Sequence, residues 1–283
     1  MKIVQFRTRA RSGYGVVSGN GIVEPTEGFT SQYETLQDVL AGDGLEALAK
    51  DVDGRPGSIK LDEVQLQPPL GPSSKIICVG INYRKKYPVE GAAPEPDNII
   101  LFAKHHDAIV GHGEALELPL GEAAGTFDYE GEIVLVIGKA GRHIARDDAH
   151  DHIAGYTIMD DGSVRGWQKH SLHAGKNFAR SGGCGPWIVT ADEIEDASRM
   201  TLTTVVNGET RQQTDVASMI FPPDELVSYI SHFTPLAPGD MIATGSPEGA
   251  GGSYSPPRFL KAGDTVEISV SGVGTLRNTV EST

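Results

Sequence analysis

The chain of 283 residues has the composition of an ordinary globular protein, and its length allows one large domain or a large domain with a small one. Its formal net charge is −14, from 24 Lys and Arg against 38 Asp and Glu, which argues against nucleic acid or an anionic membrane as a partner. Cys78 and Cys184 provide neither a disulfide framework nor a cysteine metal site, and the N-terminus lacks a signal peptide's apolar segment, so a cytoplasmic location is expected.

Residues 1–70 are predicted to form a small α+β domain. Its expected strands are Lys2–Phe6, Tyr14–Gly19 and Gly21–Pro25. Leucines at helical spacing in Thr35–Val52 then indicate a broken helix or two short ones, because two glycines interrupt the pattern. Proline and glycine in Gln67–Ser74 mark a boundary, after which residues 71–283 are expected to form the main domain.

The main domain is predicted to be mainly β, with few helices. Its expected strands are Lys75–Asn82, Asn98–Lys104, Ile133–Ile137, Ala154–Asp160, Trp187–Thr190, Leu202–Gln213, Asp240–Gly245, Asp264–Gly272 and Gly274–Val280. Asn207 and Gly208 are typical of a two-residue hairpin turn. The expected helical stretches are Asp147–Ala154, Gly162–Leu172 and, with the strongest pattern, Pro222–Phe233.

Two glutamates stand at the entrance of the most apolar strand. Glu130 and Glu132 are separated only by Gly131, and Ile133–Ile137 follows as an unbroken apolar run. Side chains two apart on a strand point to the same face, so the two carboxylates are expected side by side. Since like charges this close repel each other, the pattern indicates a cation between them.

A third carboxylate follows at the end of the strand Ala154–Asp160. Asp160 and Asp161 precede an expected helix, and only one of two adjacent side chains can face the glutamates. Three carboxylates from two strand ends form an all-oxygen site that suits a hard divalent ion such as Mg²⁺. Each piece alone is more often structural, as a solvated strand face or a helix N-cap.

Further polar residues follow in the chain. Arg165 and Gln168 lie on the expected helix after Asp161, and Lys176 stands beside a glycine in AGKNF. The loop TGSPEGAG, residues 244–251, offers hydroxyl and backbone N–H groups that suit a substrate carboxylate.

With these motifs the sequence resembles the fumarylacetoacetate hydrolase family. The resemblance spans about residues 75–281 and rests on GINY, DYEGE, GYTIMDDGSVRGWQ, GKNF followed by GPWIVT, and TGSPEGAG, in that order. It implies a β-roll of mixed sheets in a homodimer, often with a small N-terminal domain. It also implies Mg²⁺, Mn²⁺ or Ca²⁺ as cofactor and a small 2-oxo acid as substrate.

The resemblance assigns roles to individual residues. Glu130, Glu132 and Asp161 match the metal ligands, whereas Asp160 falls where relatives more often have Asn. Gln168 and Lys176 match catalytic positions that contact substrate, and Lys176 is expected to help hold the negative charge of an enolate. The expected substrate-binding residues are Tyr83, Arg84, Lys86, Arg165, Thr244, Gly245 and Ser246, the last standing where relatives often carry Thr.

The segment after Tyr83 departs from the family's hydrolytic members. They usually carry His and Glu there, on a short helix that covers the substrate, and the His activates water. Here Lys86 and Val89 occupy those positions. His105 and His106 are the expected replacement bases, although surface histidines are the commoner interpretation. The cluster of Arg84, Lys85 and Lys86 is either a solvated charge run or a grip for a second substrate carboxylate.

Three hypotheses about function follow. The first is a metal-dependent hydrolase that cleaves a carbon–carbon bond in an acylpyruvate. The second is a decarboxylase, isomerase or hydratase of a 2-oxo acid such as oxaloacetate, which needs no water-activating base. The third is a relative that only binds metal or ligand, against which the complete carboxylate set with Gln168 and Lys176 argues.

Overall fold

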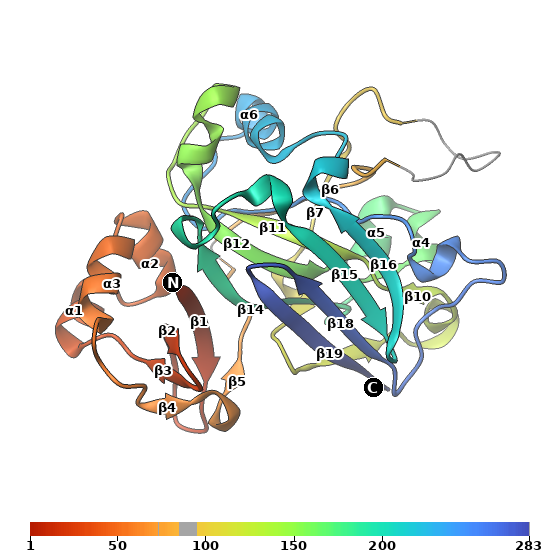
Figure 1. Cartoon of the computed structure of the whole chain (residues 1–283). Helices are drawn as coiled ribbons and strands as arrows, with labels where there is room; N and C mark the ends of the chain where they lie inside the picture. The colour runs from red at the N-terminus through yellow and green to blue at the C-terminus, as the bar shows by residue number, and fades with distance from the viewer. Residues whose placement is uncertain (73, 85–94, 283) are drawn as a thin grey trace.

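Two long antiparallel strands, β11 (Gly131–Ile137) and β12 (Ile153–Asp160), form the centre of the fold in this computed structural model, which describes residues 1–72, 74–84 and 95–282. They belong to a large sheet with the hydrogen-bonded order β4-β3-β2-β1-β14-β12-β11-β17-β6-β7. Strand β5 pairs with β1 in the same sheet, and β8 pairs with β14 (Figure 1). All seven residues of β11 are buried, as its apolar sequence predicts.

The other strands of this sheet are distributed along the chain between Lys2 and Ala243. They are β1 (Lys2–Arg7), β2 (Ser12–Ser18), β3 (Gly21–Val23), β4 (Ile59–Lys60), β5 (Gln65–Leu66), β6 (Ile76–Val79), β7 (Leu101–Ala103), β8 (Ile109–Val110), β14 (Gly182–Thr190) and β17 (Met241–Ala243). Strands β6 and β17 are parallel neighbours, whereas β17 and β11 are antiparallel, so the sheet is mixed.

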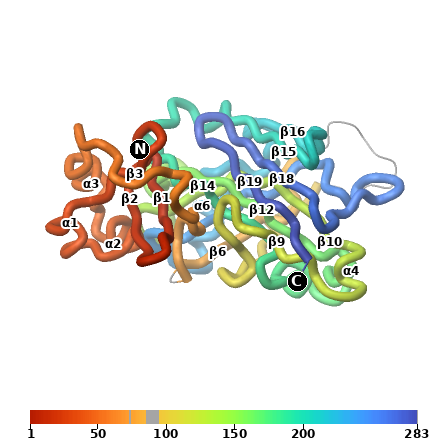
Figure 2. The backbone as a smooth tube through the Cα atoms, turned by 90° about the horizontal axis from the view of Figure 1, so that it is seen from below, coloured from red at the N-terminus to blue at the C-terminus, as the bar shows by residue number. Residues whose placement is uncertain are grey.

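The N-terminal strands continue the main sheet. Strand β1 pairs with β14 through Lys2 opposite Val189 and Ile3 opposite Ile188. Three helices cover this end of the sheet: α1 (Glu27–Gln32), α2 (Leu36–Ala41) and α3 (Leu45–Val52). Figure 2 shows this N-terminal module at one end of the molecule and β10 and α4 at the other. Because the sheet is continuous, the boundary near residue 70 stays a prediction.

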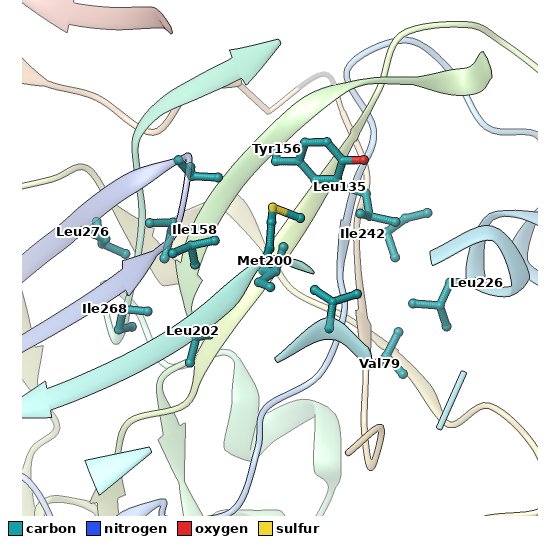
Figure 3. Close-up of a cluster of buried hydrophobic side chains, with 14 of the residues drawn as sticks. Val79, Leu135, Tyr156, Ile158, Met200, Leu202, Leu226, Ile242, Ile268 and Leu276 are labelled. Carbon is teal, nitrogen blue, oxygen red and sulfur yellow. The ribbon is translucent and has the colours of Figure 1, made fainter. Parts of the chain in front are cut away.

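A second sheet packs on the face of β11 and β12. Its order is β16-β15-β18-β19-β9. These strands are β9 (Ala115–Leu118), β15 (Thr201–Val206), β16 (Glu209–Asp215), β18 (Thr265–Val270) and β19 (Gly274–Ser282). Figure 3 shows part of the core between the sheets and under α6 (Pro223–Phe233), where Leu135 and Ile158 meet Leu202, Leu226 and Ile268.

Gly131 allows the two sheets to approach closely at the site. A Cβ at this position would lie 2.3 Å from Thr204 Oγ1 and 3.1 Å from Ile268 Cγ2, both on the second sheet. The alternation along β11 then directs Ile133 and Leu135 into the core beneath the second sheet. Glu130 and Glu132 lie on the opposite face, together with Val134, whose apolar neighbours form a separate cluster.

The predicted elements agree with the fold in most places. The broken helix over Thr35–Val52 is two helices, α2 and α3, and a side-chain and backbone capping box at Thr35 and Asp38 starts the first. The stretch 162–172 divides into β13 (Ser163–Val164), which pairs with β10 (Phe127–Asp128), then α4 (Arg165–Gln168) and the first residue of α5 (Leu172–Lys176). The stretch 147–154 is mostly a 3₁₀ helix, and α1 was not predicted. None of the described helices is long and apolar enough to cross a membrane.

Candidate active site and metal centre

The ends of β11 and β12 bring the three predicted metal ligands together. Glu130 and Glu132 flank the first residue of β11, and Asp161 follows the last residue of β12. The antiparallel register pairs Gly131 with Asp160, and the Asp161 N–H donates to the Glu130 carbonyl at 2.8 Å. One carboxylate oxygen from each of Glu130, Glu132 and Asp161 lies within 4.8 Å of the others.

Two cations already partner Glu130. The Lys176 ammonium, at the end of α5, donates to Glu130 Oε2 and to Asp161 Oδ2. Arg165 Nη2 donates to Glu130 Oε1 at 2.8 Å. Burial raises the pKa of Glu130, but the positive charges of Lys176 and Arg165 outweigh this effect and lower the pKa to about 2. This carboxylate is therefore ionised at neutral pH. Burial alone would lower the pKa of Lys176, but Asp161 and Glu130 raise it, so the ammonium stays charged.

Arg165 also ties the site to the glycine-rich loop. Its Nε donates to Asp128 Oδ2 at 2.8 Å. Asp128 is fully buried and accepts the N–H groups of Gly251 at 2.7 Å and Gly252 at 2.9 Å. Arg165 therefore connects Glu130 and Asp128 in one charged network, and Asp128 links that network to the last residue of the loop TGSPEGAG.

No cation among the described residues forms an ion pair with Glu132 as Lys176 and Arg165 do with Glu130. It is buried, and its Oε2 accepts the Gly245 N–H at 2.9 Å. Burial and the nearby Asp161 raise the pKa of Glu132 well above its ordinary value, so the ionised form lacks compensation in this pocket. A cation placed between Glu132 and its two carboxylate neighbours would supply that compensation.

The charge of the whole cluster fits a divalent ion. Five carboxylates, Asp128, Glu130, Glu132, Asp160 and Asp161, stand against the three cations Lys104, Arg165 and Lys176, so two formal negative charges remain among these described residues. The three converging carboxylates offer only oxygen, the donor that Mg²⁺, Mn²⁺ and Ca²⁺ prefer. The residues present therefore fit such an ion.

Asp160 faces away from this triad. Its Oδ1 accepts the Glu130 N–H at 2.9 Å, and its buried Oδ2 has no hydrogen-bond partner in the described part of the chain. Burial raises the pKa of Asp160 to about 7, and the hydrogen bond from Glu130 only partly opposes this shift. This geometry agrees with the expectation that Asp161, rather than Asp160, is the ligand.

A cavity of about 390 Å³ opens beside the triad. Glu130, Arg165, Gln168, Lys176 and Ser246 contribute to its polar lining, and Val79, Ile100, Phe102 and Leu172 are among its apolar residues. Two polar groups of the lining, Gln168 Nε2 and Tyr83 Oη, are buried and have no hydrogen-bond partner among the described residues. Such orphan polar groups are free to bind a ligand that enters the cavity.

Hydrogen bonds to β11 hold the predicted carboxylate-binding loop. The Thr244 hydroxyl donates to the Ile133 carbonyl at 2.9 Å, and the Gly245 N–H is used by Glu132, so these two residues anchor the loop to β11. Ser246 lines the cavity instead, and Gln212 Nε2 donates to its hydroxyl oxygen at 2.8 Å. The Ser246 hydroxyl in turn donates to the Pro247 carbonyl at the long distance of 3.4 Å.

The predicted replacement bases lie elsewhere. His105 and His106 line a different hollow, together with Ser74 and Lys104, and His106 Nε2 is 2.8 Å from the Ser74 carbonyl. The described lining of the cavity beside the triad contains no histidine. Arg84 is part of that lining, and its Nη1 donates to the Met219 carbonyl at 3.1 Å. Lys86 lies outside the described residues.

Three residues of this region were not singled out from the sequence. Asp128 belongs to the DYEGE motif, but a carboxylate three residues before a strand gives no signal that it will be buried beneath an arginine. Lys104 closes the strand pattern NIILFAK, and Glu248 lies in the glycine-rich loop at the edge of the cavity. Residues 85–94 contain no histidine, so sequence alone shows that this segment cannot supply one.

The fold and this constellation define a family, and the comparisons agree. Residues 75–281 match the family model for the fumarylacetoacetate (FAA) hydrolase C-terminal domain. The chain therefore belongs to the fumarylacetoacetate hydrolase family and is an enzyme of that family, as its resemblance predicted.

Curated relatives and a solved structure extend the comparison. Oxaloacetate tautomerase YisK of Bacillus subtilis (strain 168) is 38% identical over 224 residues, which are 78% of this chain and 74% of that protein. Mitochondrial oxaloacetate tautomerase FAHD2A of Bos taurus is 36% identical over 299 residues and covers 99% of this chain and 91% of its own. The crystal structure of maleylpyruvate hydrolase from Sphingobium sp. SYK-6 in complex with manganese(II) and pyruvate has a TM-score of 0.81 and 27% identity, covering 100% of this chain and 99% of that one.

Proposed function

We propose that this enzyme is a divalent-metal-dependent tautomerase of a small 2-oxo diacid, with oxaloacetate as the first substrate to test. The carrying observation is a cavity that opens at Glu130, beside the two other converging carboxylates. It offers buried donors without partners among the described residues, and its described lining contains no histidine. Such a site can stabilise charge on a 2-oxo acid but lacks the usual water-activating base. The two oxaloacetate tautomerases named above support the same reaction.

Glu130, Glu132 and Asp161 would hold the ion, with Mg²⁺ proposed and Mn²⁺ as the laboratory probe. When bound, the ion supplies Lewis-acid polarisation of the substrate oxygens. Ser246 lines the cavity, and its hydroxyl, whose 3.4 Å contact with the Pro247 carbonyl is long, suits the C1 carboxylate. Gln168 Nε2 and the Lys176 ammonium are donors for the negative charge that develops at the C2 oxygen.

Tautomerisation also requires a proton to move at C3. The enol loses its O–H proton and gains one at C3, so no atom is lost from the substrate. Glu248 lines the cavity and has no partner among the described residues, whereas Glu130 is engaged by Lys176 and Arg165. We assign the C3 proton transfer to Glu248, and we expect Glu248→Gln to lower kcat by roughly 10²–10⁴-fold at unchanged Mn²⁺ affinity.

Arg84 is the residue that we assign to the second carboxylate. It lines the cavity, its side chain is half exposed, and Nη1 is held by the Met219 carbonyl. An anchored guanidinium suits a carboxylate at the mouth of the cavity. A variant Arg84→Met should therefore raise KM for a diacid more than for pyruvate-like monoacids.

Hydrolysis of an acylpyruvate is the second candidate. Its supporting observation is the fold of the maleylpyruvate hydrolase, which resembles this chain over its whole length. On this alternative His105 and His106 were the expected bases, and both line a hollow other than the one beside the triad.

The test compares reactions on one preparation loaded with Mn²⁺. Loss of enol-oxaloacetate absorbance reports tautomerisation, pyruvate release from oxaloacetate reports decarboxylation, and acid release from an acylpyruvate reports hydrolysis. We expect tautomerisation to be fastest and to survive in His105→Ala and His106→Ala. Fast acylpyruvate hydrolysis that either histidine variant abolishes would instead favour the hydrolase.

We further propose that the enzyme is a homodimer. Leu120 is 77% exposed and Trp167 is 42% exposed, and both line one surface hollow with Phe178. Large apolar side chains grouped in this way are typical of a protein interface. Sedimentation at micromolar concentration should give a dimer of the 30.1 kDa chain, and a species of one chain only would count against it.

A further inference from the structure

Lys104 is a fully buried cation directly behind the metal-ligand candidates. It follows β7, and the side chains of Lys104 and Asp161 are both 0% exposed. An ammonium has three N–H donors, and Nζ has three acceptors here: Asp161 Oδ1 at 2.7 Å, the Gly162 carbonyl at 3.1 Å and the Lys176 carbonyl at 2.7 Å. The hydrogen-bonding capacity of this lysine is therefore used completely.

The two carboxylate oxygens of Asp161 have different partners. Its Oδ1 is bound by Lys104, and its Oδ2 is turned toward Lys176 and the other two carboxylates. A carboxylate held at one oxygen keeps its orientation, so the other oxygen stays directed at the place of the ion. Because Lys104 also binds the main chain of Lys176, the same ammonium holds a residue that lines the cavity.

We propose that Lys104 is a positioning residue of the metal centre, an inference that rests on the metal site of the proposed function. Lys104 is not part of the described lining of the cavity beside the triad, so it acts through Asp161 and Lys176 rather than on the substrate. It connects the end of β7 to the ends of β12 and α5, and its partners Asp161 and Lys176 lie 57 and 72 residues further along the chain.

A role in stability alone does not account for this arrangement. A buried ion pair is weak evidence for stability, because apolar side chains of the same volume often serve as well. The stem of Lys104 is already packed as an apolar residue would be, since a Cβ added at Gly182 would lie 3.3 Å from its Cε. What an apolar replacement would lose is the fixed orientation of Asp161 Oδ1 and of the Lys176 carbonyl.

The test measures Mn²⁺ affinity by titration calorimetry on the whole chain. Lys104→Met keeps the length of the side chain and removes the ammonium. We expect the affinity for Mn²⁺ to fall by roughly 10–100-fold, the usual effect of removing a group that orients a metal ligand. Should this variant not fold, Lys104→Gln provides the same comparison, and at least a tenfold loss is expected.

Lys75→Met is the control, with a lysine side chain that is 43% exposed. Lys75 also pairs with a buried carboxylate, its Nζ lying 2.5 Å from Asp240 Oδ2, and Asp240 is not among the metal-ligand candidates. This variant should lower the melting temperature of the metal-free protein and leave Mn²⁺ affinity unchanged. A purely structural Lys104 would behave in the same way as Lys75.

Glu132→Ala distinguishes failure of the positioning role of Lys104 from failure of the metal site. Wild-type Mn²⁺ affinity in Lys104→Met, together with loss of binding in Glu132→Ala, would overturn the positioning role and leave the metal site intact. Wild-type affinity in both variants would overturn the metal site itself. A loss in Lys104→Met and Glu132→Ala but not in Lys75→Met is the expected result.

Discussion

The N-terminal module buries apolar side chains, whereas the region beneath the cavity buries charged ones. Within residues 1–72, all of which are described, the buried residues are apolar, such as Phe6, Leu36 and Leu48, and every polar or charged residue keeps some exposure. Beneath the cavity, Lys104, Asp161 and their neighbours are almost completely buried. The two regions share one sheet through β1 and β14, so the difference does not come from separate folds.

This contrast shows where the fold is optimised for stability and where it is not. Apolar burial stabilises a module in proportion to the area removed from water. Burial of five carboxylates with three cations leaves an uncompensated charge, most clearly at Glu132, whose pKa is raised by burial and by Asp161. We attribute that imbalance to function, because a bound divalent ion would remove it.

The strongest test of the contrast is Lys176→Met. Lys176 is 5% exposed and is shared by Glu130 and Asp161, so its removal leaves two buried carboxylates without their common cation. Loss of one partner from a buried pair typically costs about 3–5 kcal/mol of unfolding free energy. Urea titration of the metal-free protein should show this loss, and tautomerisation should fall with it. An unchanged urea midpoint would contradict the ion-paired arrangement.

A core variant of the N-terminal module should separate stability from metal binding. Leu36 is fully buried at the start of α2. Leu36→Ala removes buried methyl groups and should lower the unfolding free energy by about 2–5 kcal/mol. Leu36 is neither a metal-ligand candidate nor part of the described lining of the cavity, although its apolar cluster extends to Val134 and, at its edge, to Phe102. Mn²⁺ affinity of the folded protein should therefore stay at the wild-type value. Calorimetry that showed a tenfold loss would mean that the module supports the site.

Much of the fold was predictable because it depends on local patterns. The unbroken apolar run of β11 and the helical spacing of Leu226 and Ile230 in α6 both reflect which faces are buried. The two-residue strands β4, β5 and β8 were missed, since a pair of residues carries no periodicity. The pairing of β1 with β14 was also beyond reach, because it joins residues 185 or more positions apart.

The candidate site was predictable where chain geometry sets it. Alternation along a strand placed Glu130 beside Glu132, and the strand end placed Asp161, whereas the triad's closeness depends on the register of β11 with β12. Lys104 and Asp128 were missed because their roles come from long-range contacts. His105 and His106 were predicted from their closeness in sequence to the segment after Tyr83, but such closeness does not determine the side of the sheet that a loop reaches.

The pH dependence of stability at Asp160 also tests the excess of buried carboxylates over buried cations. Its folded pKa is about 7, against an ordinary value near 4 in the unfolded chain. Between these values the unfolded chain releases the proton and the folded chain keeps it, so rising pH lowers the free energy of unfolding. The full effect, present above about pH 7, is on the order of 4 kcal/mol.

Asp160→Asn should remove this pH dependence. Asparagine keeps an oxygen that accepts the Glu130 N–H, but it carries no charge. Urea midpoints of the metal-free proteins should be similar near pH 4, and the variant should be the more stable protein at pH 8. Mn²⁺ affinity should change little, because Asp160 is outside the triad. Parallel stability curves of variant and wild type from pH 4 to 8 would contradict the shifted pKa.

The smallest effect is expected at an ion pair on the surface of the N-terminal module. Lys50 and Glu46 are one turn apart on α3, with side chains 74% and 82% exposed. The hydrogen bond from Lys50 lowers the pKa of Glu46, but water and salt screen an interaction between groups this exposed. Lys50→Met should therefore leave the urea midpoint unchanged within error, at low and at high salt. The same lysine-to-methionine change thus separates the two environments: a loss at Lys50 as large as that at Lys176 would show that burial of the pair is not what decides its contribution.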